Sequence, residues 1–269
     1  MDLKDISYAS FPKIGDIFLN LGNVEANLRN MTKAKEYHER ALEIFRAQYG
    51  HSHEMVARSL INLAGLACSN PNECSDGVKY AELAFKIDNR PFIEGIYYMN
   101  LGKQEHIQEN FLKAANYYIQ ALEIFNNKAE NVNGIRPVRD VTNMALICTN
   151  LGIIYWGLNY LEESKHSFNW SIEFYLIANG LNHLGLADSY YNLGLTHFKL
   201  DELPEAEDCF RRALEIYSKQ FGPSHKVIAM VSRKLAGVLE EAGQSNEAAH
   251  LDKEYGTCRK KDIDLNGYS

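Results

Sequence analysis

The side chains that could do chemistry in this 269-residue chain are few and scattered. His51 and His53 stand close together, but no carboxylate or cysteine follows at the spacing of a metal site, so we interpret them as part of a loop between helices. Cys68 and Cys74 flank Pro71 in a turn-rich segment, and nothing there predicts a lowered thiol pKa. Phosphate-binding Gly-rich loops, Gly-x-Ser-x-Gly elbows and His-Glu-x-x-His motifs are absent. The sequence therefore predicts a protein that is not an enzyme and has no cofactor or metal site.

Composition and charge restrict the partners. The chain has 28 Lys and Arg against 35 Asp and Glu, a net charge of −7, so it lacks the positive field that nucleic-acid binding requires. Five cysteines without a Cys-x-x-Cys pair are typical of reduced thiols in the cytoplasm. The first residues lack an apolar signal core, and no apolar stretch reaches the ~20 residues of a membrane span. We therefore expect a soluble, cytoplasmic protein that binds neither nucleic acid nor membrane.

A repeated pattern indicates the architecture that must position any binding residues. The string Asn-Leu-Gly, or a near copy, occurs six times, with its leucine at Leu21, Leu63, Leu101, Leu151, Leu193 and Leu235. Small residues follow the leucine at constant distances in four copies, as Ala114 and Ala121 follow Leu101. Successive leucines are 38 to 50 residues apart, which leaves room for two helices of about four turns and two short connections. The sequence therefore predicts six helix pairs.

The small residues have a packing explanation. Helices that pack at close range need Gly or Ala where their backbones nearly touch, whereas Leu and aromatic side chains fill the remaining gaps. One helix pair cannot bury its own apolar face, so the pairs must stack. The periodicity thus predicts an all-α fold, an α-solenoid with an inner and an outer surface.

Breaks in the pattern predict the boundaries. Helix-ending residues such as Gly50, Gly180 and Gly222 follow the expected second helices. The longest connection, residues 126–142, could be a hinge, a binding loop or a tolerated insertion. We expect a single array over residues 1–258 and a flexible tail over 259–269. The six repeats are placed at residues 14–50, 56–89, 94–128, 143–179, 186–221 and 228–256.

The repeat resembles a known family. The fifth unit has an aromatic residue, then Leu-Gly, then Ala, an aromatic and Ala, namely Tyr190, Leu193, Gly194, Ala206, Phe210 and Ala213. This order resembles the tetratricopeptide repeat. A period near 42 residues and the junction from Tyr49 to His53 resemble the long repeats of kinesin light chains. The resemblance implies a right-handed superhelix that binds peptides, helices or whole domains along its concave face without cofactors.

The first helix of each unit carries the candidate binding residues, because in similar repeats these helices line the inner groove. An asparagine precedes the packing leucine in five units, about 100° away around the helix axis, so we expect it not to share the leucine's burial. Each amide could bind the main chain of a partner, or could bond neighbouring helices to hold the stack in register. The predicted groove consists of Asn20, Asn23, Asn62, Asn100, Lys103, Thr149, Asn150, Ile153, Trp156, Tyr191, Asn192, Leu195 and Arg233.

The middle-to-late part of this predicted groove is apolar and aromatic. Trp156 and Phe198 could anchor a partner side chain, or could pack between adjacent helix pairs. The basic residues Lys103 and Arg233 are too dispersed to favour a clamp for a chain terminus. We therefore predict a scaffold or adaptor that binds a peptide or amphipathic helix of a partner protein. The alternative is a regulatory or ligand-sensing region of a larger protein.

Overall fold

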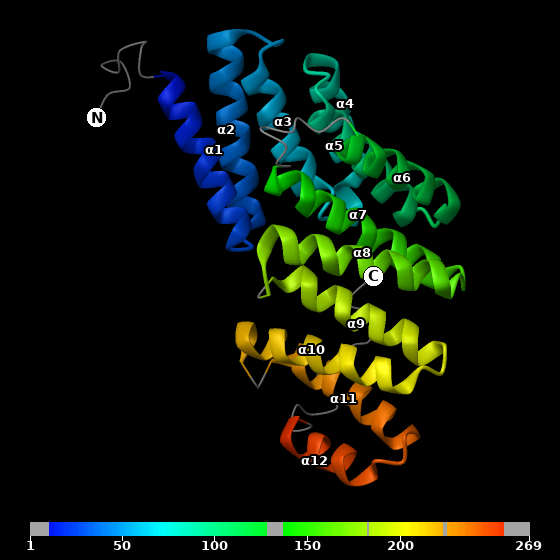
Figure 1. Cartoon of the computed structure of the whole chain (residues 1–269). Helices are drawn as coiled ribbons and strands as arrows, with labels where there is room; N and C mark the ends of the chain where they lie inside the picture. Colours follow the sequence, from blue (N-terminus) through cyan, green and yellow to red (C-terminus); the bar gives the residue numbers. More distant parts are fainter. Residues whose placement is uncertain (1–10, 128–136, 182, 223–224, 256–269) are drawn as a thin grey trace. The chain divides into compact units, whose positions relative to one another are not determined.

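The computed structural model describes residues 11–127, 137–181, 183–222 and 225–255, and these form helices and turns without a strand (Figure 1). The chain divides into two compact units, Met1–Glu130 and Asn131–Ser269. The first unit contains α1 (Phe11–Asn27), α2 (Met31–Tyr49), α3 (Glu54–Ala67), a short 3-10 helix η3 (Pro71–Glu73), α4 (Cys74–Ile87), α5 (Pro91–Ile107) and α6 (Phe111–Asn127). The second unit contains α7 (Val138–Gly157), α8 (Leu161–Asn179), α9 (Leu184–Lys199), α10 (Leu203–Phe221), α11 (Lys226–Glu241) and α12 (Ser245–Tyr255).

Within each unit the helices pack as consecutive hairpins. In the first unit α1 packs on α2, α3 on α4 and α5 on α6, and in the second unit α7 packs on α8, α9 on α10 and α11 on α12. The first helices of successive pairs also approach one another, α1 with α3, α3 with α5 and α7 with α9, so they share one side of each stack. The predicted all-α fold of stacked helix pairs is confirmed. The single array and its repeat boundaries stay a prediction, and the tail at 259–269 lies outside the described residues.

The glycine of the Leu-Gly pair packs against a ring from the second helix of the same hairpin. A Cβ built on Gly152 would lie 2.6 Å from Phe168 Cε1. The sequence interpretation placed backbone against backbone at the small residues, whereas at these glycines an aromatic or imidazole ring occupies the space. The same relation holds sixteen residues apart in four pairs, Gly22–His38, Gly102–Tyr118, Gly152–Phe168 and Gly194–Phe210.

Serine replaces alanine in the fourth pair and brings hydrogen bonds into the packing. Ser164 and Ser171 are fully buried. Ser164 Oγ donates to the Gly152 carbonyl at 2.9 Å. Ser171 Oγ lies 2.7 Å from Thr149 Oγ1 and 2.8 Å from Ser189 Oγ. This network joins α7, α8 and α9. Buried hydroxyls are costly when they lack a hydrogen-bond partner, and these have partners, so the serines are accommodated in the packed interior.

Histidines cap the start of three first helices. His53, His183 and His225 each accept a hydrogen bond at Nδ1 from the backbone N–H two residues further on, at the start of α3, α9 and α11. Such a cap satisfies one of the free N–H groups of the first turn. Each imidazole also stacks on a ring of the preceding helix, with centroids 4.1 to 4.9 Å apart, on Tyr49, Tyr175 and Phe221 respectively. The histidines at these junctions therefore hold one pair onto the next.

The turn inside most pairs contains a residue with positive φ. Arg29, Glu109, Asn159 and Asp201 have φ of 62° or 63°, and Gly243 takes the equivalent place in the sixth pair with φ of 78°. The left-handed region costs a residue with a Cβ about 1 kcal/mol, a cost that glycine does not have. Four of these turns therefore store a small amount of backbone strain.

Replacing Glu109 by glycine should relieve this strain. We expect Glu109→Gly to raise the free energy of unfolding by about 0.5–1 kcal/mol, since the Glu109 side chain is exposed. Its neighbour Gln108 has φ of −84°, so Gln108→Gly should lower the free energy of unfolding by about 0.5 kcal/mol instead. Chemical unfolding followed by circular dichroism measures both, and a loss of stability in Glu109→Gly would contradict the prediction.

Candidate partner-binding surface

The predicted asparagines of the first unit have three different environments. Asn62 on α3 donates from Nδ2 to Asn23 Oδ1 on α1 at 3.1 Å, so this pair joins two neighbouring first helices. Asn20 is exposed. Asn100 is only 4% exposed, and its Nδ2 has no hydrogen-bond partner. The expectation that these amides stay out of the packed interior is wrong at Asn100, because α5 packs against α3, α4 and α6 and only Ile107 of its residues is exposed.

Lys103, one turn beyond Asn100 on α5, is half-buried. Burial lowers the pKa of His106, and the positive charge of Lys103 lowers that pKa further. The charge of Lys103 thus affects the imidazole of His106 on the same helix.

Two of the predicted residues on α7, Ile153 and Trp156, are exposed and share one face of the helix. Ile153 and Trp156 are 37% and 38% exposed, and Leu146, seven residues before Ile153, is 41% exposed. The Nζ atom of Lys199 on α9 lies 4.6 Å from the centroid of the Trp156 ring. Leu146 is not among the sequence-predicted residues, although its helical spacing from Ile153 places it on the same face. We call Leu146, Ile153 and Trp156 the α7 strip.

Asn150 and Asn192, the two repeated asparagines of the second unit, are half-buried. Asn192 on α9 donates from Nδ2 to the Asp188 carbonyl one turn back, at 2.9 Å. Asn150 on α7 follows Thr149, whose hydroxyl is bonded to Ser171. The five repeated asparagines therefore do not behave alike. Only Asn62 shows the bond between neighbouring helices that a register-holding role requires.

Aromatic and basic residues of α9 and α11 complete the predicted set. Tyr191, Leu195 and Phe198 are half-buried and pack against the core of the second unit. Tyr191 also lies 5.7 Å from Phe210, measured between ring centroids. Arg233 on α11 is exposed. Trp156 is thus the most exposed of these aromatic residues, whereas Phe198 packs against the core.

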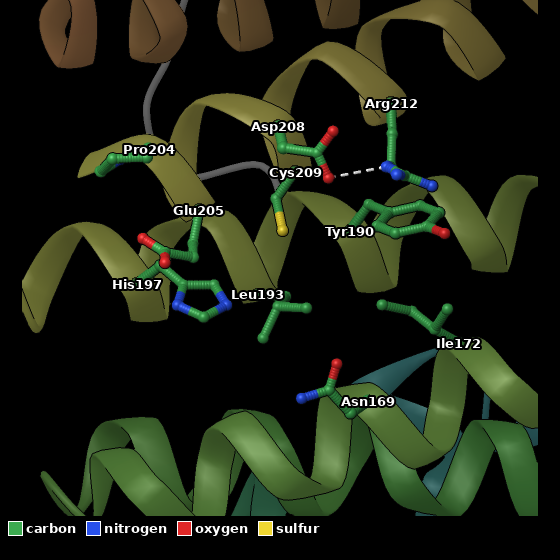
Figure 2. Close-up of a pocket in the computed structure, with 10 residues that line it drawn as sticks. All are labelled: Asn169, Ile172, Tyr190, Leu193, His197, Pro204, Glu205, Asp208, Cys209 and Arg212. Atoms are coloured by element: carbon green, nitrogen blue, oxygen red, sulfur yellow. Dashed lines mark hydrogen bonds and ion pairs between the residues drawn. The ribbon is translucent and has the colours of Figure 1, made fainter. Parts of the chain in front are cut away.

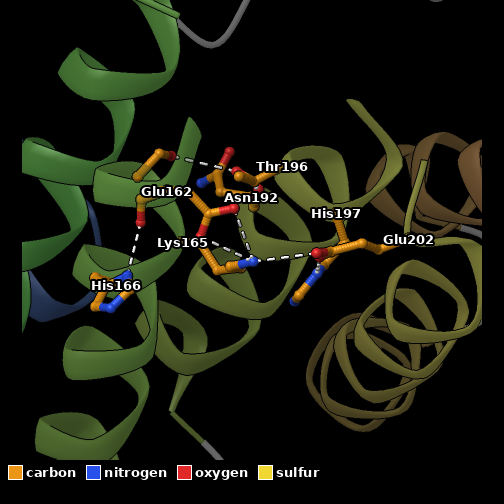
Figure 3. Close-up of polar contacts among 8 residues, drawn as sticks. Glu162, Lys165, His166, Asn192, Thr196, His197 and Glu202 are labelled. Carbon is orange, nitrogen blue, oxygen red and sulfur yellow. Dashed lines mark hydrogen bonds and ion pairs between the residues drawn. The ribbon is translucent and has the colours of Figure 1, made fainter. Parts of the chain in front are cut away.

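A polar cluster holds the turn between α9 and α10 against α8 (Figure 3). Lys165 on α8 pairs with Glu162 at 3.0 Å and with Glu202 at 3.1 Å, and Glu202 also binds His197. Hydrogen bonds from His197 and Lys165 lower the pKa of Glu202, and hydrogen bonds to the two carboxylates raise the pKa of Lys165. The cluster fixes the C-terminal end of α9, the helix that carries three predicted site residues.

A pocket of about 450 Å³ lies elsewhere in the second unit, between α8, α9 and α10 (Figure 2). Ile172, Leu193 and Cys209 give it an apolar lining. Its charged lining residues are Glu205 and the ion pair of Asp208 with Arg212 at 2.7 Å. None of the sequence-predicted residues lines this pocket, and the sequence shows only that Asp208 and Arg212 share a face of one helix.

The described helices carry neither a metal cluster nor a membrane span. Among the residues in the described ranges, no three His, Cys, Asp or Glu side chains gather in a way that suits a metal ion. No helix in these same ranges has the length and apolar character to cross a membrane. On α7 the exposed side chains include Leu146, Ile153 and Trp156, and on α9 they are Asp188 and Lys199. Apolar and aromatic side chains beside charged ones can bind a polypeptide segment.

A family model and solved structures agree with this arrangement. The model of the tetratricopeptide repeat matches residues 14–88 and 178–255, which together make up more than half of the chain. The chain therefore belongs to the tetratricopeptide repeat family, whose fold forms scaffolds for protein interactions. No curated protein sequence matches it. The narrower resemblance to kinesin light chains stays a prediction.

Similar solved structures come from different contexts. BtubC (BKLC) from P. vanneervenii is 19% identical with a TM-score of 0.63, over 91% of this chain and 93% of that chain. A chain of the APC/C hetero-tetramer Cut9-Hcn1 is 16% identical with a TM-score of 0.65, over 91% of this chain and 40% of that chain. A STAND signal-transduction ATPase with a tetratricopeptide repeat sensor, from Pyrococcus horikoshii, is 16% identical with a TM-score of 0.62, over 93% of this chain and 38% of that chain. At these identities the likeness shows the fold alone.

Proposed function

We propose that the chain is a scaffold or adaptor that binds a peptide or helical segment of a partner protein along its first helices. The α7 strip supports this most directly. Single exposed hydrophobic residues are ordinary on protein surfaces, but Leu146, Ile153 and Trp156 recur at the spacing of one helix face. An apolar row of this kind matches the anchor side chains of an amphipathic helix or an extended segment.

The surroundings of the α7 strip suggest what the partner segment contains. The Oδ1 atoms of Asn150 and Asn192 can accept hydrogen bonds from a partner main chain. Lys199 beside Trp156 places a positive charge next to the strip, in a chain whose net charge is −7. We therefore expect a segment with aliphatic or aromatic anchors and at least one acidic residue.

Trp156 and Trp170 provide a matched test, because they are the two tryptophans of the chain and both are exposed. Trp170 lies on the second helix α8 and is 54% exposed. For peptides selected from a displayed library on the unaltered chain, Trp156→Ala should weaken binding about tenfold or more. Trp170→Ala should leave the affinity unchanged. Fluorescence anisotropy of the labelled peptides measures both affinities.

Equal losses in the two variants, or no loss in Trp156→Ala, would contradict the proposal if circular dichroism shows both variants folded. The ligand-sensing alternative predicts a different result. A small molecule would raise the melting temperature of the chain, and no peptide would be selected.

A further inference from the structure

Two cysteine sulfurs meet at the turn between α3 and α4. Cys68 caps the C-terminus of α3, and Cys74 is the first residue of α4. Their Sγ atoms lie 3.0 Å apart, and the two residues are 2% and 1% exposed. The sequence shows only two cysteines in a turn-rich segment, whereas the structure brings the sulfurs into contact.

The neighbouring residues hold this contact in place. A Cβ built on Gly77 would lie 2.5 Å from Cys68 Sγ, so the glycine leaves the space that the Cys68 sulfur occupies. Asn70 Oδ1 accepts a hydrogen bond from the Asn72 N–H at 3.1 Å, which closes the turn that leads into α4. The geometry is therefore set by a tight turn on one side and by the missing side chain of Gly77 on the other.

We propose that Cys68 and Cys74 are an oxidation site at which hydrogen peroxide forms a reversible disulfide. A disulfide has an S–S distance of about 2.0 Å, so the two sulfurs need to approach by about 1 Å. Residues 69–72 between the two cysteines are exposed, so only this one turn of chain separates the sulfurs from a small oxidant in solvent. The product would link the end of α3 to the start of α4.

Cys74 is the sulfur that attacks the peroxide. The N-terminus of α4 stabilises a thiolate at this position. The hydrogen bond between the two sulfurs lowers the pKa of Cys74 against the effect of burial, and the charge of Lys103 lowers it further. The Cys74 thiolate takes one oxygen of the peroxide to form a sulfenic acid and releases hydroxide, which collects a proton as water.

Cys68 completes the reaction. Its sulfur attacks the sulfenic sulfur of Cys74, the S–O bond breaks, and the leaving hydroxide takes the Cys68 proton to form a second water. Two thiols and one peroxide thus become one disulfide and two waters. A thiol reductant returns the pair to the dithiol by exchange through a mixed disulfide.

Peptide mass spectrometry tests this site on the full chain. Trypsin leaves both cysteines on one peptide, residues 59–79, because no Lys or Arg lies between Arg58 and Lys79. After limiting peroxide and alkylation of remaining thiols, this peptide should be two hydrogens lighter and unalkylated, and dithiothreitol should restore it. Replacing Cys258, which lies outside the described residues, by serine in every sample removes one source of intermolecular bridges.

Cys148 and Cys209 are internal controls. Burial raises the pKa of each to about 12, and neither touches a second cysteine in the described ranges. The 59–79 peptide should oxidise about tenfold faster or more than either control. In Cys68→Ser the peptide should not lose two hydrogens, and Cys74 should instead be trapped as a sulfenic acid by dimedone.

The proposal is overturned if the pair oxidises no faster than Cys148 and Cys209. It is also overturned if the peptide gains oxygen without losing two hydrogens while circular dichroism shows the chain folded. Formation of the disulfide only in urea would overturn it as well, because the native contact would then play no part.

Discussion

Gly152→Ala should lower the free energy of unfolding by about 2–3 kcal/mol. A Cβ at this position would lie 2.6 to 2.8 Å from three carbons of the Phe168 ring. Phe168 is fully buried between α7 and its neighbours, so the ring has no free space to move into. Urea unfolding monitored by circular dichroism gives the change.

Gly157 is the matched control, since it is on the same helix and has no atom within 4 Å of an added Cβ. Gly157→Ala should leave stability unchanged or raise it by up to about 1 kcal/mol through helix propensity. A loss of the same size in both variants would show that backbone effects, rather than the contact with Phe168, decide the cost at Gly152.

The sequence predicts the helix pairs because their evidence is local and repeated. Leucines such as Leu151 and Leu193 and the small residues that follow them recur at fixed distances, and the structure buries both leucines. What it does not predict is how many neighbours each helix has. Leu21 is 40% exposed on α1, which packs against α2 and α3, whereas Asn100 is buried on α5, which packs against three helices.

Parts of the candidate site depend on contacts that no spacing reveals. Leu146 shares a face with Ile153, and helical periodicity is enough to find it. The contact between Cys68 and Cys74 depends on the turn after α3 and on Gly77 from the next helix, so six residues of separation alone do not predict it. The histidine caps are partly predictable, because the sequence shows an aromatic residue four positions before His53 and before His225.

His38→Phe should stabilise the chain most at acidic pH. His38 takes the place that Tyr118, Phe168 and Phe210 take in other pairs, packed against Gly22. It is buried, its Nδ1 atom has no hydrogen-bond partner, and burial lowers its pKa from 6.5 to about 4. The folded chain therefore keeps the imidazole neutral at pH values at which the unfolded chain protonates it.

The sign of the pH effect follows from proton binding. Above pH 6.5 neither state binds a proton at His38, so His38 does not reduce the free energy of unfolding. Between pH 6.5 and 4 the unfolded state binds the proton and the folded state does not, so stability falls as pH falls, by about 3 kcal/mol at the acidic end of this window. Phenylalanine cannot titrate, so His38→Phe should remove this part of the pH dependence while the contribution of the carboxylates remains.

Urea midpoints measured from pH 7 to pH 4 for the native chain, His38→Phe and the exposed control His51→Gln give the comparison. If the native chain and His38→Phe lose stability in parallel, His38 is not the group that titrates, because the difference between their curves contains only the proton bound at this side chain.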